Sequence, residues 1–171
     1  MRSTDVLRNA FDRLPDLVRA AVNGLDADQL AHRPDPGANS IAWLIWHLTR
    51  IQDDHVADLA GQEQVWTADG WAGRFGLLLD SRDTGYGHTP EQVGSVRPSP
   101  DLLVGYFDAA HARTLAYLDR IADDDLDRII DRRWTPPVTA GVRLVSVIGD
   151  SHQHVGQACY LRGLIDRTLA T

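Results

Sequence analysis

Apolar residues recur at intervals of three and four along four long stretches of the chain, the spacing that places them on one face of a helix. The first stretch begins near Thr4, contains Pro15 and ends near Gly24. Because proline removes a helical hydrogen bond and crowds the preceding turn, we expect this helix to bend or divide at Pro15. Residues 25–38 hold two prolines and a glycine, and they predict a connector.

The second stretch begins after Asn39 or Ser40, either of which is a suitable N-cap, and ends near Gly61. Its predicted buried face consists of Trp43, Leu44, His47, Leu48, Ile51, His55 and Leu59. Residues 62–98 are rich in proline and glycine and carry embedded aromatic residues. They predict a long crossover with a little helix in it.

Ser99 followed by Pro100 forms an N-cap and first-turn pair, which opens a third helix running to about Ile121. The acidic residues 123–125 predict a short connector helix, and the prolines in 134–137 exclude regular structure there. Thr139 can cap a fourth helix that ends near Gly163. The pattern therefore predicts an all-α, four-helix bundle with a long crossover between helices two and three, and a single domain over residues 1–171.

Composition narrows the class of protein. The chain is 43% hydrophobic and 24% charged, which is ordinary for a globular domain. Its formal charge of −7 argues against a nucleic-acid surface, since such surfaces depend on clustered positive charge. No apolar run approaches the roughly 20 residues that span a bilayer. The single cysteine, Cys159, cannot form an internal disulfide. We therefore expect a cytoplasmic protein without nucleic-acid or membrane partners.

Two residues of the fourth helix are placed to hold a metal ion together. Asp150 and His154 are four positions apart, so both side chains leave the same face one turn apart. His47 lies in the apolar face of the second helix, where an imidazole must be hydrogen-bonded or ligated. Spacing alone leaves two readings open, a metal site and an ordinary hydrogen-bonded core histidine.

Other histidines fit such a site less well. His152 and His154 point roughly 200° apart on a helix, so they cannot share an ion. His55 is about 12 Å from His47 along the helix axis, which is too far to co-ligate. His111 faces inward on the third helix and can be a core residue, a pocket acid or base, or an additional ligand.

Two segments carry a resemblance to a known family. They are residues 39–48, with the sequence NSIAWLIWHL, and His154-Val155-Gly156-Gln157 followed by Tyr160-Leu161-Arg162-Gly163. Together they resemble the DinB-like superfamily of metalloenzymes over nearly the whole chain.

The resemblance implies a four-helix bundle with a metal triad at His47, Asp150 and His154. The common form of the family has histidine where this chain has Asp150. In the related mycothiol-dependent maleylpyruvate isomerases a glutamate stands there, so two histidines with one carboxylate resemble a known variant.

Three protein ligands leave open positions on a metal ion, the arrangement of a catalytic site. Zinc is the first candidate, and nickel, manganese and iron are also compatible with these ligands. The resemblance implies a low-molecular-weight thiol of the mycothiol type as cofactor, and hence a thiol S-transferase or isomerase acting on a small-molecule substrate. Additional pocket residues predicted here are His111 and Tyr86 as catalytic groups and Arg143 and His88 as cofactor-binding groups.

Two alternatives remain open at this stage. The first is a metal-dependent hydrolase, in which the ion activates water. The second is a non-catalytic, metal-binding stress-related protein, a homodimer through the outer faces of its helices. Dependence on a thiol separates the thiol S-transferase or isomerase hypothesis from both alternatives.

Overall fold

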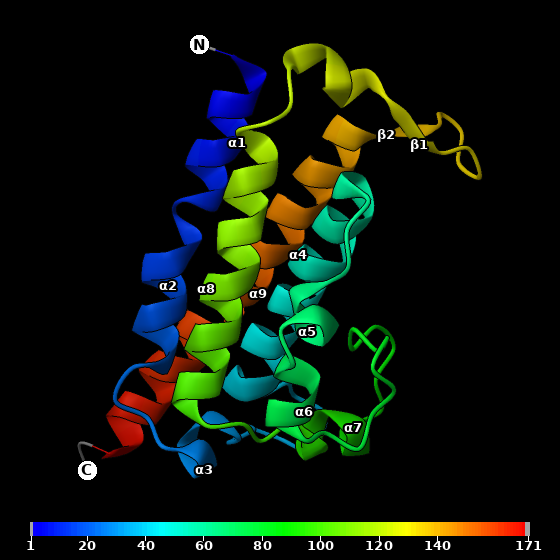
Figure 1. Cartoon of the computed structure of the whole chain (residues 1–171). Coiled ribbons are helices and arrows are strands. Elements are labelled where there is room, and N and C mark those ends of the chain that lie inside the picture. The colour runs from blue at the N-terminus through cyan, green and yellow to red at the C-terminus, as the bar shows by residue number, and fades with distance from the viewer. Residues whose placement is uncertain (1, 170–171) are drawn as a thin grey trace.

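Five helices form the body of the molecule in the computed structural model, which describes residues 2–169. They are α1 (Ser3–Phe11), α2 (Leu14–Val22), α4 (Ile41–Ala60), α8 (Pro100–Leu118) and α9 (Ala140–Leu169). Figure 1 shows them running along the length of the molecule, with α1 and α2 nearly end to end. The all-helical fold predicted from the sequence is confirmed.

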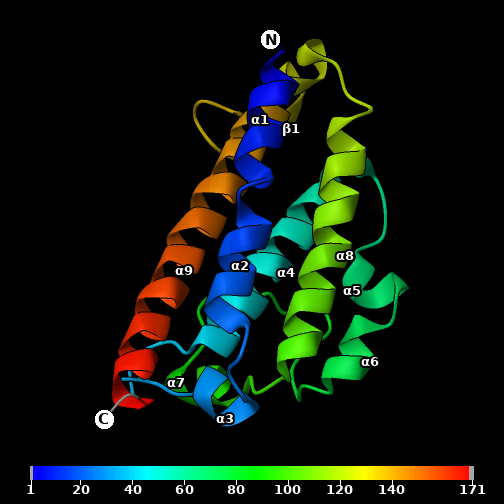
Figure 2. The ribbon, with the colours of Figure 1, turned by 90° about the vertical axis from the view of Figure 1, so that its left-hand side faces the viewer.

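The helices pack side by side around one hydrophobic core. Helix α4 packs against both α8 and α9, and α2 packs against the same two helices from the other side. Figure 2, turned by 90°, shows α1 and α2 between α9 and α8. The result is a bundle in which α1 and α2 together act as one broken member.

The break in that member falls where proline predicts it. Pro15 lies in the first turn of α2, where its missing N–H costs no helical hydrogen bond. Phe11 and Leu14, on either side of the break, are fully buried. The two short helices therefore keep one continuous apolar face against the core.

Helix α4 is fixed at both ends by local chemistry. The Ser40 hydroxyl accepts a hydrogen bond of 3.1 Å from the Trp43 backbone N–H, and Gly61 ends the helix in the left-handed region with φ +62°. Every residue from Ser40 to Arg50 is buried. This half of the helix is thus covered on all sides, beyond the single face that the periodicity predicts.

Short elements fill the connections between the long helices. The predicted connector contains α3 (Ala27–Leu30), and the predicted crossover contains α5 (Val65–Ala68), α6 (Trp71–Phe75) and α7 (Pro90–Ser95). The acidic connector forms the 3-10 helix η1 (Asp123–Asp127). None of the helices in the described part of the chain is both long and apolar enough to cross a bilayer.

Two details differ from the sequence prediction. A small antiparallel hairpin, β1 (Ile129–Asp131) and β2 (Val138–Thr139), flanks residues 134–137. Strands this short leave no periodicity to detect, and their pairing is irregular. In addition, α9 continues past Gly163 to Leu169, because Ile165 still packs into the core beyond the glycine.

Candidate metal centre

The fold brings His47, in the first half of α4, together with Asp150 and His154, in the middle of α9. One potential ligand atom from each residue lies within 4.8 Å of those of the other two. His47 is only 5% exposed, whereas the side chains of Asp150 and His154 are 30% and 20% exposed. The triad is therefore anchored in the core on one side and reaches solvent on the other.

The ring of His47 is held in one orientation. Its Nδ1 lies 2.5 Å from the Thr84 carbonyl oxygen, which can only accept a hydrogen bond, so Nδ1–H is the donor. The Trp43 ring stacks on the imidazole with centroids 4.6 Å apart. Burial lowers the pKa of His47, which favours the neutral ring. A neutral ring protonated at Nδ1 leaves the Nε2 lone pair free for a ligand.

The ring of His154 is also held through its Nδ1–H, here by a residue of its own helix. Its Nδ1 lies 3.1 Å from the Gln157 side-chain oxygen, so Nδ1–H donates there. Its Nε2 faces Asp150, 3.5 Å from Oδ1, and the hydrogen bond to Asp150 raises the pKa of His154. The other Asp150 oxygen, Oδ2, is buried and has no hydrogen-bond partner among the described residues.

These observations fit a divalent metal ion. Metal-ligating histidines usually donate their second ring N–H to a carbonyl, carboxylate or amide oxygen, as both histidines do here. The buried, unpartnered oxygen of Asp150 is a group that an ion would satisfy. Bonds of about 2.0–2.2 Å keep the ligands of one ion within roughly 4.4 Å of one another. The observed spacing reaches that limit with small side-chain movements.

A loop from the crossover closes over the triad. Asp83 accepts hydrogen bonds from the Gly85 backbone N–H at 2.8 Å and from His88 Nε2–H at 3.0 Å. The other nitrogen of His88 accepts from the Trp43 indole N–H at 3.0 Å. Gly85 has φ +91°, and a Cβ there would lie 2.9 Å from His47 Nδ1. The loop thus needs glycine at this position to reach the ligand.

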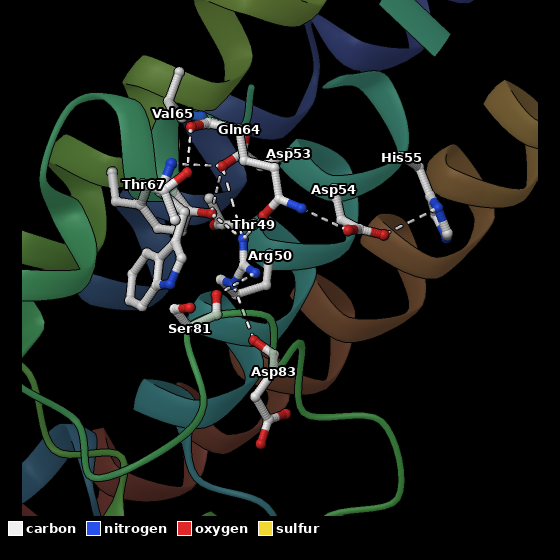
Figure 3. A network of polar contacts seen from close by, with 12 residues as sticks. Thr49, Arg50, Asp53, Asp54, His55, Gln64, Val65, Thr67, Ser81 and Asp83 are labelled. Atoms are coloured by element: carbon white, nitrogen blue, oxygen red, sulfur yellow. Dashed lines mark hydrogen bonds and ion pairs between the residues drawn. The ribbon is translucent and has the colours of Figure 1, made fainter. Parts of the chain in front are cut away.

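A fully buried arginine ties this loop to the bundle. Arg50 Nε donates to the Asp83 carbonyl at 3.1 Å, and its Nη atoms donate to Gln64 at 2.7 Å and to the Ser81 carbonyl at 3.4 Å. Figure 3 shows these contacts from the loop through Arg50 to Asp53. Asp53 lies 3.8 Å from the guanidinium. Burial raises the pKa of Asp53, so Arg50 stabilises a costly charge.

The structure places the remaining predicted residues in three different surroundings. Tyr86 and Arg143 line one open pocket of about 510 Å³. The side chain of His88 is buried and both ring nitrogens are bonded to protein groups, so direct ligand contact would require one of those bonds to break. His111 stacks on Phe107 with its Nε2 3.6 Å from Asp12, on the face of α8 toward α1 and α2.

His152 and His55, which the sequence predicts are not metal ligands, lie outside the triad. His152 Nδ1–H donates to the Ile148 carbonyl within its own helix at 2.9 Å. His55 accepts a hydrogen bond of 2.9 Å from Arg143 at Nδ1. The predicted buried face of α4 is wrong in its second half, however, because Ile51 and His55 are only half-buried. Gln52, Asp53 and Val56 are buried there instead.

Sequence reasoning missed the residues that orient the ligands. Trp43, Thr84 and Gln157 contact the two histidines directly, and Arg50 and Asp83 hold the loop. Gln157 carried a usable signal, because it lies three residues after His154 on the same helix face. The Thr84 carbonyl carried no such signal, since a pattern of residue types does not show which backbone carbonyl will accept a hydrogen bond.

Comparison with known proteins found a family and a solved structure that this chain resembles. The model of the DinB superfamily matches residues 10–158. The crystal structure of a conserved protein from Enterococcus faecalis is 34% identical, with a TM-score of 0.90, and the match covers 96% of this chain and 98% of that one. A comparison with curated proteins gave no match. The family match spans most of the sequence and includes all three residues of the triad, so the chain belongs to the DinB superfamily.

Proposed function

We propose that this protein is a metal-dependent enzyme that activates a low-molecular-weight thiol for transfer or isomerisation of a small substrate. The observation that carries the proposal is the triad itself, two imidazoles and one carboxylate with an exposed side. Three ligands leave at least one coordination position for another molecule. Zinc is the first candidate for the metal on ligand type, with nickel, manganese and iron as alternatives.

His47, Asp150 and His154 would hold the ion, and a divalent ion there would supply the chemistry that the proposal needs by lowering the pKa of a thiol ligand. The chain's own residues supply orientation and shielding. Thr84 and Gln157 fix the two imidazoles, and Trp43 covers His47 from solvent. Burial lowers the pKa of His47, which favours the neutral ring whose lone pair can bind a metal ion.

A pocket beside the triad can receive the rest of the ligand. Its lining includes Ser146, which lies one helical turn before Asp150 on α9. Its lining also includes Tyr86, which directly follows Gly85, the residue in contact with His47. Its volume of about 510 Å³ falls within the range of small-molecule sites. The thiol class follows from the likeness of the two-histidine, one-carboxylate set to mycothiol-dependent isomerases.

Cobalt substitution tests the thiol. Cobalt-loaded protein titrated with mycothiol or N-acetylcysteine is expected to develop a sulfur-to-metal charge-transfer band in the near ultraviolet. N-acetylserine, which replaces sulfur with oxygen, is the matched control and is expected to give no such band. An unchanged spectrum at millimolar thiol, with cobalt still bound, would contradict the thiol proposal and favour activation of water.

A further inference from the structure

The pocket that adjoins the triad has an unusual charge for this chain. Its lining includes Arg133, Arg143 and Asp131, so its formal charge is positive whereas the whole chain carries −7. Asp131 is paired with Arg133, with an Nη2 to Oδ2 distance of 2.7 Å. The pair leaves Arg143 as the cation that is not neutralised within the pocket.

Arg143 has a hydrogen-bond partner without a compensating charge. Its Nη1 donates to His55 Nδ1 at 2.9 Å. Burial and the neighbouring Arg143 lower the pKa of His55, so the ring that accepts this bond is neutral. Among residues 2–169, no carboxylate oxygen lies within 4.0 Å of a guanidinium nitrogen of Arg143. Asp131 lines the same pocket and has its pKa lowered in part by Arg143, and Asp54 lies 3.5 Å from His55 Nδ1.

The guanidinium is also held in place. Asp54 lies 3.5 Å from His55 Nδ1 and accepts a 2.7 Å hydrogen bond from Gln64, which in turn binds Arg50. Figure 3 shows this line of contacts from Arg50 to His55. The network runs from the buried Arg50 to half-exposed side chains, and Arg143 is held at its outer end by one hydrogen bond to His55. Part of the side-chain freedom of Arg143 is therefore already lost before an anion binds.

Two aromatic side chains border the same pocket from separate segments. Trp134, in the link between β1 and β2, is 65% exposed, and Tyr86, in the loop over the triad, is 91% exposed. Aromatic rings offer a large, flat contact area and stack against other planar groups.

We propose that this pocket binds the carboxylate of a small organic acid at Arg143, with the planar, unsaturated body of the acid against Trp134 and Tyr86. Guanidinium groups bind carboxylates through paired, charge-assisted hydrogen bonds. Arg143 and Asp150 are seven residues apart on α9, which places them on nearly the same face and about 10.5 Å apart along the axis. The proposal deepens the proposed function, because it assigns the substrate class of the same site.

Benzoate and benzamide form a matched pair of probes, equal in shape and different in charge. Calorimetric titration of the full chain after chelator treatment is expected to show saturable benzoate binding and weaker benzamide binding. Arg143→Gln is expected to weaken benzoate binding about tenfold or more, the effect of losing a charge-assisted hydrogen bond. Arg82→Gln removes an exposed arginine that is paired with Asp80 and is the control expected to bind as the parent does.

Two further variants separate the explanations. His154→Ala is expected to retain benzoate binding, since the carboxylate is held by Arg143 and not by a metal. Trp134→Ala, at an exposed position outside the helices, is expected to weaken it while leaving the fold intact. Equal binding of benzoate and benzamide, unchanged affinity in a folded Arg143→Gln protein, or no saturable binding would overturn the proposal. Purified protein that contains no metal and cannot be loaded with zinc, nickel, manganese or iron would refute the proposed function and leave these binding results standing.

Discussion

Replacing Arg50 by methionine tests whether the buried network both stabilises the bundle and orients the metal ligand. Methionine fills a similar volume without charge or donors. The change removes hydrogen bonds to Asp83, Ser81, Gln64 and Tyr106, and it leaves Asp53 without a cation in the core.

The magnitude follows from the burial of the pair. Both side chains are almost inaccessible, at 0% and 3% exposed. Removing one partner of a buried ion pair costs about 3–5 kcal/mol, because the other charge stays buried without compensation. Asp53 keeps its hydrogen bonds from the backbone N–H groups of Val65 and Trp66, at 3.0 and 2.9 Å. These bonds place the expected loss near the lower end of that range, at about 3 kcal/mol.

The assay combines urea unfolding at 25 °C with metal competition against a chromophoric chelator. Arg50→Lys is the matched control, because a single ammonium can compensate Asp53 but cannot serve both loop carbonyls. We expect the lysine variant to recover much of the stability while both variants lose about tenfold or more in metal affinity.

Either measurement can refute this reasoning. A loss of unfolding free energy below about 1 kcal/mol in Arg50→Met would show that the network contributes little. Unchanged metal affinity in a folded Arg50→Met protein would show that the loop does not orient His47.

Three other changes test separate parts of the site and fold. Gly85→Ala is expected to lower metal affinity, because the added Cβ would meet the His47 ring. Gly87→Ala is the control, since at φ +75° with nothing within 4 Å it carries backbone strain alone. Competition with a chelator measures the metal affinity of both variants. Gln157→Met is expected to weaken metal binding about tenfold, measured in the same way, since His154 loses the acceptor that fixes its ring. The pKa of Asp131 is lowered to about 2, first by its hydrogen bond with Arg133, so the stability it contributes is complete above about pH 4 and is lost as the pH falls toward 2. Melting temperatures of the parent and Asp131→Asn are therefore expected to differ at pH 6 and converge by pH 2, and a constant difference would contradict this assignment.

Local chemistry made much of the bundle predictable from the sequence. Pro15, Ser40 and Gly61 act on their own turn of chain, so their effect does not depend on distant packing. The same holds for the one-turn spacing of Asp150 and His154. The hairpin at 129–139 and the last turn of α9 depend on contacts between distant residues, and the sequence pattern missed them.

The candidate metal ligands were predictable from the sequence, and the residues that hold them in place were not. His47 was recognisable because a polar ring in an apolar face needs a partner. That its partner is the carbonyl of Thr84 depends on the path of a crossover that carries no periodicity. Arg50 is the clearest case, since an arginine in a helix usually reaches solvent, and only the loop carbonyls and Asp53 account for its burial.

Elemental analysis of protein purified without chelator tests the central claim most directly. The account predicts close to one divalent ion per chain. The ion is expected to be lost in His154→Ala and kept in His152→Ala, because His152 is bonded to the Ile148 carbonyl on another side of α9. Protein that contains no metal and cannot be loaded with zinc, nickel, manganese or iron would contradict the account, as would equal metal loss in both folded variants.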